Sequence, residues 1–189
     1  MAEVKITLPI SEKDVRQLKC GDIIYLSGTI YTARDAVHKY FYEGGESPVA
    51  LEGMAVYHCG PVTIKDEDGN WQITAAGPTT SMREEPYMAK VIADNKIRFV
   101  IGKGGMGRET AKACIENGCV YLSAYGGCAQ LLADKIVKVS NVYFYEEFGA
   151  PEAMWEMQVK GFPAVVTIDS KGGNLHSEVQ DNSFKNAAY

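Results

Sequence analysis

Apolar and polar residues alternate along the chain in two rhythms, one typical of strands and one typical of helices. Strand-like alternation dominates up to about residue 83, interrupted by two short stretches with helical spacing. Between residues 86 and 136, helix-like stretches alternate with short apolar runs, and strand-like segments then return. This order predicts an α/β fold with mixed sheets, in which crossover helices connect parallel strands in the middle of the chain.

Turn residues and helix caps at the ends of each periodic stretch delimit the predicted elements. We predict helices at residues 11–20, 33–42, 86–94, 107–117 and 128–136. We predict strands at residues 1–6, 23–27, 54–59, 71–75, 97–101, 120–123, 137–145, 154–159 and 164–168. An Asp-Gly pair within residues 66–70 predicts a hairpin turn between the strands at 54–59 and 71–75. Residues after about 170 show no periodicity, and we expect them to be loose.

The composition suits a chain that buries its own core. With 189 residues, of which 46% are hydrophobic and 23% charged, we expect a single domain over residues 1–189. Nineteen Lys and Arg against 24 Asp and Glu give a net charge of -5, without a basic run that could follow a phosphate backbone, so nucleic acid is not an expected partner. The N-terminus alternates like a strand rather than a signal peptide, and no apolar run reaches the roughly 18 residues of a membrane span. We therefore expect a cytoplasmic protein.

The five cysteines form an odd set in a chain of ordinary globular composition, which favours reduced thiols over a disulfide framework. The spacing of Cys114, Cys119 and Cys128 differs from that of common iron–sulfur runs, and Cys114 falls inside a predicted helix. Neither a Cys-x-x-Cys pair nor a His-Glu-x-x-His zinc motif is present. We therefore predict no metal ligand in this chain.

A glycine-rich segment, Gly-Lys-Gly-Gly-Met-Gly at residues 102–107, follows a predicted strand and opens a predicted helix. This is the setting of a dinucleotide-binding loop, but the acidic residue expected about 20 positions later is missing, since residues 123–127 are Ser-Ala-Tyr-Gly-Gly. The glycines more readily allow backbone amides to approach some other anion, with Lys103 adding a positive charge. A purely structural turn is one alternative, and a nucleotide- or phosphate-binding module at residues 102–107 is another.

Two further segments, residues 27–35 and 77–83, place an arginine beside small hydroxyl residues at predicted strand-to-helix turns. Such turns commonly carry the sites of α/β proteins. Arg34 and Arg83 have planar guanidinium groups that match a carboxylate through two parallel hydrogen bonds, and together with Lys103 they suit a small dianion. Alternatively, Arg34 pairs with Asp35 or another surface acid, and the threonines only cap a helix.

The three histidines differ in their surroundings. His38 follows Arg34 by four residues, so the two share a predicted helix face and His38 is a candidate hydrogen-bond donor or acid/base group. We expect His58, in an apolar strand, and His176, in the tail, to be packed or solvated.

The motifs together resemble one known family. They are Ser-Gly-Thr-Ile-Tyr-Thr-Ala-Arg-Asp-x-x-His at residues 27–38, Ala-Gly-Pro-Thr-Thr-Ser-x-Arg at 76–83, and Gly-Lys-Gly-Gly-Met at 102–106. Tyr-His-Cys-Gly-Pro at 57–61, Gly-Gly at 126–127 and Phe-Pro at 162–163 add weaker support. The chain resembles the oxygen-sensitive hydro-lyases: the C-terminal domain of class I fumarase and the β subunits of two-subunit fumarases and tartrate dehydratases.

The resemblance implies a swivelling β/β/α domain that works with a partner. It implies reversible hydration of a small dicarboxylate, with fumarate as the first expectation and tartrate or another diacid as the alternative. A 4Fe-4S cluster would be ligated by three cysteines of a partner α subunit and not by this chain. The expected assembly is a heterotetramer, with a homodimer as an alternative for the isolated chain.

The resemblance also implies roles for individual residues. Arg34, Arg83 and Lys103 would bind the substrate carboxylates, and Thr79 would be the candidate base. Residues placed around them would be Thr29, Asp35, His38, Thr80 and Gly104. Class I fumarases commonly have Lys-Gly-Asn-Arg where this chain has Lys-Gly-Gly-Met at residues 103–106, which fits the two-subunit branch. A non-catalytic scaffold that docks the α subunit is a further alternative.

Overall fold

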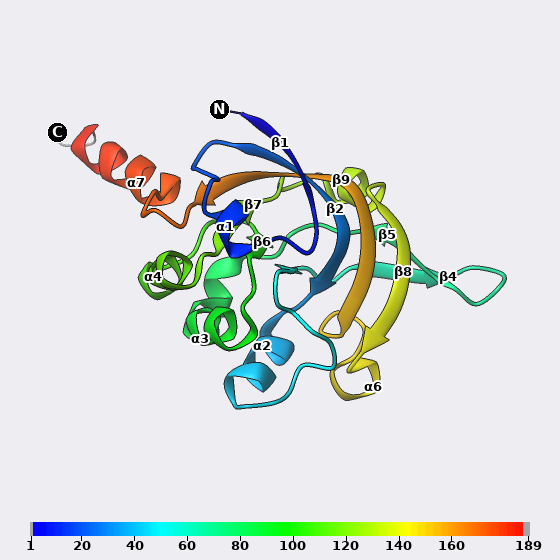
Figure 1. Cartoon of the computed structure of the whole chain (residues 1–189). Helices are drawn as coiled ribbons and strands as arrows, with labels where there is room; N and C mark the ends of the chain where they lie inside the picture. The colour runs from blue at the N-terminus through cyan, green and yellow to red at the C-terminus, as the bar shows by residue number, and fades with distance from the viewer. Residues whose placement is uncertain (1, 187–189) are drawn as a thin grey trace.

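A computed structural model describes residues 2–186 and shows a mixed α/β architecture (Figure 1). The strands are β1 (Glu3–Thr7), β2 (Ile23–Thr32), β3 (Ala55–Tyr57), β4 (Val62–Lys65), β5 (Trp71–Ala75), β6 (Phe99–Gly102), β7 (Val120–Ser123), β8 (Ile136–Tyr143) and β9 (Met154–Ile168). The helices are α1 (Glu12–Val15), α2 (Asp35–Tyr42), α3 (Glu85–Asn95), α4 (Arg108–Asn117), α5 (Ala129–Ala133), α6 (Tyr145–Phe148) and α7 (Leu175–Asn186). A 3-10 turn, η1 (Ser81–Glu84), precedes α3.

Seven strands form one mixed sheet in the order β1-β2-β3-β6-β7-β9-β8. Strands β1, β2, β3, β6 and β7 pair in parallel, whereas β9 is antiparallel to β2, β7 and β8. Because β9 pairs with both β2 and β7, it closes β2, β3, β6 and β7 into a small barrel-like sheet. The predicted α/β class, with mixed sheets and crossover helices between parallel strands, is confirmed.

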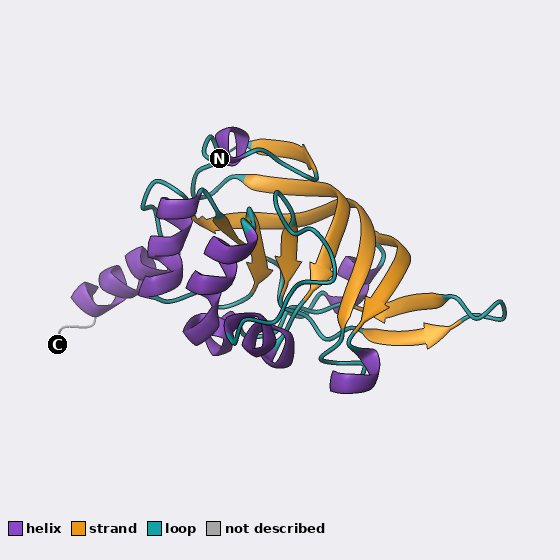
Figure 2. Ribbon diagram, turned by 60° about the horizontal axis from the view of Figure 1, so that its bottom comes forward, coloured by secondary structure: helices purple, strands orange, loops and turns teal. Residues whose placement is uncertain are grey.

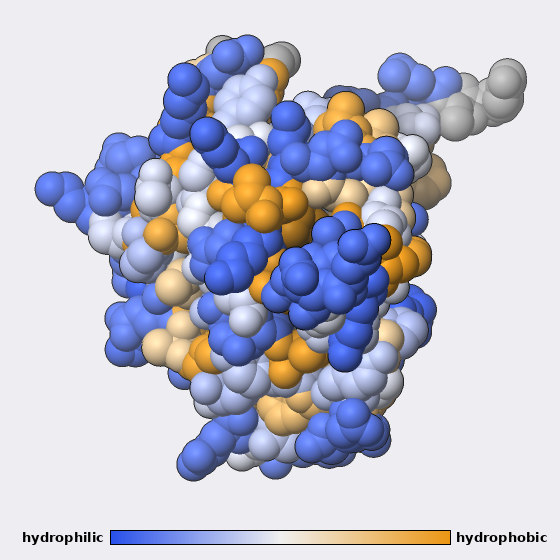
Figure 3. Space-filling view, turned by 90° about the vertical axis from the view of Figure 1, so that its right-hand side faces the viewer, coloured by the Kyte–Doolittle hydropathy of each residue, from blue (hydrophilic) through white to orange (hydrophobic). Residues whose placement is uncertain are grey.

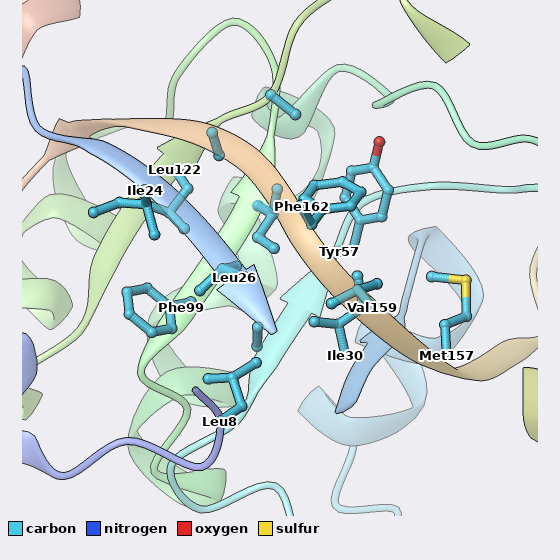
Figure 4. Packing of buried hydrophobic residues seen from close by; sticks show 14 of the residues in the cluster. Leu8, Ile24, Leu26, Ile30, Tyr57, Phe99, Leu122, Met157, Val159 and Phe162 are labelled. Atoms are coloured by element: carbon cyan, nitrogen blue, oxygen red, sulfur yellow. The ribbon is translucent and has the colours of Figure 1, made fainter. Parts of the chain in front are cut away.

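The strands separate two apolar clusters because their side chains alternate between the faces of the sheet. Leu26, Phe99 and Phe162 belong to the cluster inside the barrel and point into the space that β2, β6 and β9 enclose (Figure 4). The second cluster lies between the outer face of the sheet and the helices that Figure 2 shows grouped on one side, and it contains Val100 and Ile92. Both faces of the parallel strands are therefore covered, as parallel sheets require.

β2 bends where it passes the N-terminal segment. Its pairing with β9 shifts register between Leu26 and Gly28, and Gly28 has φ +106. A Cβ on Gly28 would lie 2.9 Å from the carbonyl oxygen of Leu8, so both the conformation and the close approach require glycine. The bend lets β2 run for ten residues, to Thr32, instead of ending at residue 27 as predicted.

One predicted strand pairing is wrong, and one predicted break between strands is absent. The hairpin partner of β5 is β4, not the segment at 54–59, because Gly60 and Pro61 end that segment and β3 joins the large sheet. The predicted strands at 154–159 and 164–168 form one 15-residue strand, β9. The tail, where periodicity predicted no element, includes helix α7 over Leu175–Asn186, and residues 187–189 lie outside the described part.

Some apolar side chains of the peripheral strands are exposed. Val62 and Ile64 of β4 are 57% and 49% exposed, and Val137 of β8 is 63% exposed. On the side of the molecule that carries these strands, apolar patches lie between charged groups (Figure 3). Such patches are typical of surfaces that contact other chains. Among residues 2–186, no helix is long and apolar enough to cross a membrane.

Candidate functional site

Three of the predicted segments meet at one edge of the sheet. Strands β2, β3 and β6 are parallel, so their carboxyl ends lie at the same edge. Arg34 follows β2, His58 follows β3, and Lys103 follows β6. The carboxyl edge of a parallel sheet is the usual site of ligand binding in α/β proteins.

Arg34 stands at the N-cap of α2 and is held by the segment that precedes β9. Its Nη2 lies 3.2 Å from Oε1 of Glu152, and Nη1 donates to the carbonyl oxygen of Pro151 at 3.4 Å. The other oxygen of the Glu152 carboxylate accepts the amide of Ala36 at 3.0 Å, which satisfies one free donor in the first turn of α2. Arg34 fits because Gly60 lacks a side chain: a Cβ there would lie 2.6 Å from Nη1.

Asp35 pairs with Arg83 and not with Arg34. Nη2 of Arg83 donates to Oδ2 of Asp35, which joins the start of α2 to η1. Because Asp35 follows Arg34 directly, this ion pair brings the two arginines to the same part of the edge. The Arg83 side chain remains 57% exposed and can reach a ligand from solvent.

Thr79 lies between the ends of β3 and β6. Its amide and its Oγ1 both donate to the carbonyl oxygen of His58, at 2.7 and 3.0 Å, and its own carbonyl accepts the amide of Lys103 at 3.3 Å. The side chain of Lys103 is exposed beside it. A carbonyl acceptor favours the Thr79 hydroxyl over the alkoxide, so a base role requires that hydroxyl to leave this bond and the nearby cations to stabilise the charge.

His38 and Glu84 lie buried beneath the arginines. Nδ1 of His38 donates to the carbonyl oxygen of Arg34 at 2.9 Å and lies 3.6 Å from Oε2 of Glu84. Burial lowers the pKa of His38 to about 4. Burial first, and then the negative charge of Asp35, raise the pKa of Glu84 to about 7. His38 thus supports Arg34 from below as a neutral donor, and its burial makes it unsuited to surface acid/base chemistry.

The other residues predicted to lie near the site, Thr29, Thr80 and Gly104, are found in different surroundings. Oγ1 of Thr29 accepts a hydrogen bond from Nε2 of Gln158 at 2.7 Å, where β2 pairs with β9. Thr29 therefore stabilises the pairing of these strands and does not lie at the carboxyl edge of the sheet. Thr80 is exposed and forms an isolated parallel bridge with Lys103. Gly104 has φ +81, with open space where a side chain would point, so the backbone conformation itself requires glycine.

The helix that follows the glycine loop already binds an anion, which is the carboxylate of Glu85 from α3. Glu85 accepts the amides of Gly107, Glu109 and Thr110 at 2.7, 3.1 and 3.2 Å, and the hydroxyl of Thr110 at 2.6 Å. These amides are the groups that a phosphate would use at this helix. The start of α4 is therefore occupied by a carboxylate of the chain itself, which counts against a nucleotide phosphate at this helix.

The cysteines do not fit a cluster or metal site. Cys59, Cys114 and Cys119 are buried in the two apolar clusters, and Cys128 lies apart at the start of α5. Burial raises the pKa of Cys59 to about 12 and that of Cys119 well above its ordinary value, so both are thiols in the folded chain. Within the part of the chain that the structure describes, no group of three or more His, Cys, Asp and Glu side chains could hold a metal ion.

The candidate residues form an open edge rather than a closed pocket. The side chains of Arg83 and Lys103 are exposed, and the candidate residues line none of five surface hollows of about 300 to 390 Å³. Sequence reasoning missed Glu152 and Glu85, because each acts on a segment far from it in the chain. The only sequence signal for either is an acid next to a predicted turn.

The barrel and its basic edge define an α/β protein that presents cations at the carboxyl ends of parallel strands. The sequence matches the family described as Fumarase C-terminus over residues 1–179, and the chain belongs to this family. The family assignment agrees with the resemblance of the three motifs.

Similar proteins fall into two kinds. The chain is 51% identical over 182 residues to a Geobacillus stearothermophilus protein named as a class I fumarate hydratase, covering 96% of this chain but 35% of that protein. It is 42% identical to a Methanocaldococcus jannaschii protein named as an L(+)-tartrate dehydratase subunit beta, covering 93% and 92% of the two chains. It is 38% identical to the L(+)-tartrate dehydratase subunit beta of Escherichia coli, covering 92% and 86%. The chain thus spans about a third of the first relative and most of the other two.

Proposed function

We propose that this chain is the β-type subunit of a hydro-lyase that adds water to, or removes it from, a small dicarboxylate. The observation that carries the proposal is the meeting of Arg34, Arg83 and Lys103 at one edge of the sheet, next to Thr79. Three cations at an open edge suit a dianion whose carboxylates they bind from one side. The membership of the Fumarase C-terminus family supports the same chemistry.

Fumarate, interconverted with malate, is the first substrate to test, and tartrate is the alternative. The relative with 51% identity is named for fumarate, whereas the relatives of similar length are named for tartrate. Discrimination between diacids that differ by one or two hydroxyl groups depends on local pocket shape. The edge described above supplies only one side of such a pocket.

The proposed roles follow from the needs of the reaction. Removal of water from a 2-hydroxy diacid needs a base for the carbon-bound proton and cations to stabilise the enolate-like charge. Arg34, Arg83 and Lys103 bind the carboxylates, with Arg34 and Arg83 held in place by Glu152 and Asp35. Thr79 is the candidate base, since its carbonyl accepts the amide of Lys103 and its segment therefore lies beside the loop that carries this cation.

The rest of the site belongs to a partner in this proposal. The relatives named subunit beta point to an α subunit, and the open edge supports a site completed by another chain. Class I hydro-lyases depend on an iron–sulfur cluster, which acts as a Lewis acid on the leaving hydroxyl. The buried thiols of this chain do not fit it, so we assign the 4Fe-4S cluster to the α subunit. We further propose a heterotetramer in the cytoplasm, and a swivelling β/β/α fold that forms a single domain.

The test is oxygen-free turnover of fumarate and of tartrate by this chain, by the α subunit reconstituted with iron and sulfide, and by their mixture. We expect activity only in the mixture. Activity of the α subunit alone would show that this chain is a scaffold, and a mixture inactive with both diacids would contradict the proposed substrates.

The residue assignment is tested in the same assay with Arg34→Ala and Arg83→Ala. Loss of a carboxylate-binding guanidinium should reduce kcat/KM at least about 30-fold, since charged hydrogen bonds of this kind contribute roughly 2–5 kcal/mol. Arg16→Ala is the matched control, because Arg16 is also paired with a glutamate, Glu12, but on α1. Equal activity of all three variants would overturn the assignment.

A further inference from the structure

The segment with Thr79 and the loop with Lys103 lie side by side at the candidate site. The amide of Ser81 donates to the carbonyl oxygen of Lys103 at 3.0 Å, and the amide of Lys103 donates to the carbonyl oxygen of Thr79 at 3.3 Å. Thr80 and Lys103 are exposed, so water competes for this short ladder, and two such bonds alone open easily. Side chains buried under these two segments must therefore keep them aligned.

A hydrogen-bonded chain of three fully buried side chains lies beneath the ladder. The hydroxyl of Tyr121 donates to Oγ of Ser81 at 2.8 Å, and Oγ of Ser81 lies 2.9 Å from Nδ1 of His58. Burial, together with the nearby His38, lowers the pKa of His58 well below its usual value, so the imidazole is neutral. Ser81 accepts from Tyr121, and its bond with Nδ1 of His58 runs in the direction that the His58 tautomer sets. The carbonyl of His58 in turn accepts both donors of Thr79.

The end of β6 is shaped to receive this chain. A Cβ on Gly102 would lie 1.8 Å from Oγ of Ser81 and 3.1 Å from Nδ1 of His58. Gly102 has no left-handed backbone conformation, so the reason for glycine is the space that the Ser81 hydroxyl occupies.

His58 is a costly residue at this position. Nδ1 bonds Ser81, but Nε2, the other ring nitrogen, has no partner among the described residues, whichever nitrogen carries the hydrogen. An unsatisfied buried donor or acceptor costs about 1–3 kcal/mol, which an apolar side chain of similar size would avoid. Stability alone therefore does not account for a histidine here, whereas alignment of the site does.

We propose that His58, Ser81 and Tyr121 are positioning residues that hold Thr79 and Lys103 in register for the hydro-lyase reaction. The inference rests on the proposed function, but the alignment can be measured without turnover. Misplacement of reacting groups by about 1 Å can cost about 100-fold in rate, so a small shift of the ladder should be visible in kcat.

The first experiment measures hydrogen–deuterium exchange of backbone amides in the full chain. Ser81→Ala and Tyr121→Phe should raise the exchange rates of the Ser81 and Lys103 amides at least about tenfold. Tyr143→Phe is the matched control, because it removes a hydroxyl that donates to Glu156 on β9. Unchanged exchange at Ser81 and Lys103 in both variants would overturn the proposal.

The second experiment measures kcat and KM of the same variants mixed with the cluster-bearing α subunit. Ser81→Ala and Tyr121→Phe should lower kcat about 10- to 100-fold and raise KM by a smaller factor, because Lys103 shifts while Arg34 and Arg83 keep their ion pairs. The double variant should be no worse than Ser81→Ala, since both act through one chain. His58→Asn, whose amide can replace Nδ1, should keep most of the activity that His58→Leu loses.

The two readouts separate the possible failures. Faster exchange with unchanged kcat in a mixture whose wild type is active would make the chain merely structural and overturn the proposal. A wild-type mixture inactive with fumarate and tartrate would be a failure of the proposed function, and exchange in the single chain does not depend on it. Equal loss in His58→Asn and His58→Leu would contradict the role of Nδ1.

Discussion

At the residue scale, two buried titratable groups beneath the site have opposite effects on stability. His38 is fully buried and Glu84 is 1% exposed, and the two approach to 3.6 Å between Nδ1 and Oε2. Because the pKa of His38 is lowered, neutral His38 contributes to the free energy of unfolding above pH 6.5, and this contribution is lost as the pH falls toward 4. Because the pKa of Glu84 is raised, protonated Glu84 contributes to the free energy of unfolding below pH 4.5, and this contribution is lost as the pH rises through about 7. The two effects partly cancel between these limits.

The variant Glu84→Gln should reveal how ionisation of Glu84 changes the stability of the fold. The variant lacks the ionisable group, so its stability relative to wild type should increase from pH 4.5 to pH 8, by at most about 3 kcal/mol at 1.4 kcal/mol per pKa unit. Urea unfolding at four pH values measures this difference. The exposed turn residue Glu67 provides the control Glu67→Gln, with a difference below about 0.5 kcal/mol throughout. A flat difference for Glu84→Gln would show that the carboxyl ionises as freely in the folded chain as in the unfolded one.

At the element scale, the sequence correctly predicted free amides at the start of α4, but it did not predict which group they bind. The glycines at 102–107 and the strand-to-helix order predict amides that approach an anion, and such amides are present at Gly107, Glu109 and Thr110. The anion is Glu85, about 25 positions earlier, at the start of α3. The pairing follows from the packing of α3 beside α4, which residue spacing does not record.

Glu85→Ala should destabilise the fold by about 1–3 kcal/mol, because four donors at the start of α4 lose their acceptor. Chemical denaturation measures the loss. Glu109→Ala, an exposed acid in the same first turn of α4, should change stability by less than about 0.5 kcal/mol. Similar losses for both variants would attribute the effect to charge at the helix N-terminus and not to the hydrogen bonds of Glu85.

At the scale of the whole molecule, α7 projects from the body of the chain (Figure 1). Its described residues include none that is buried, and Val179 and Phe184 are 68% and 70% exposed. Its start is tied to the rest: Nε2 of His176 lies 3.0 Å from Oγ1 of Thr167, and the His176 ring fills the space where Gly105 lacks a side chain. The family match also ends at residue 179.

Removal of residues 180–189 should therefore leave Tm within about 2 °C of the full chain. Truncation after Asn174 also removes His176 and its contacts, and should lower Tm by several degrees, at about 2–4 °C per kcal/mol for a chain of this size. Scanning calorimetry of the two truncated chains makes the comparison. A large drop on removal of residues 180–189 would mean that α7 stabilises the fold along its whole length.

The sequence alone determined the features that depend on neighbours along the chain: the α/β class, most of the helices, the strand-to-helix turns, and the segments with Arg34, Thr79, Arg83 and Lys103. Periodicity, caps and glycine positions record these features because they act within one or two turns of backbone. The tertiary structure decided that β9 closes the sheet, that Glu152 holds Arg34 from 118 positions away, and that His58 supports Thr79. These contacts join segments that only the folded sheet brings together, and spacing along the chain contains no information about them.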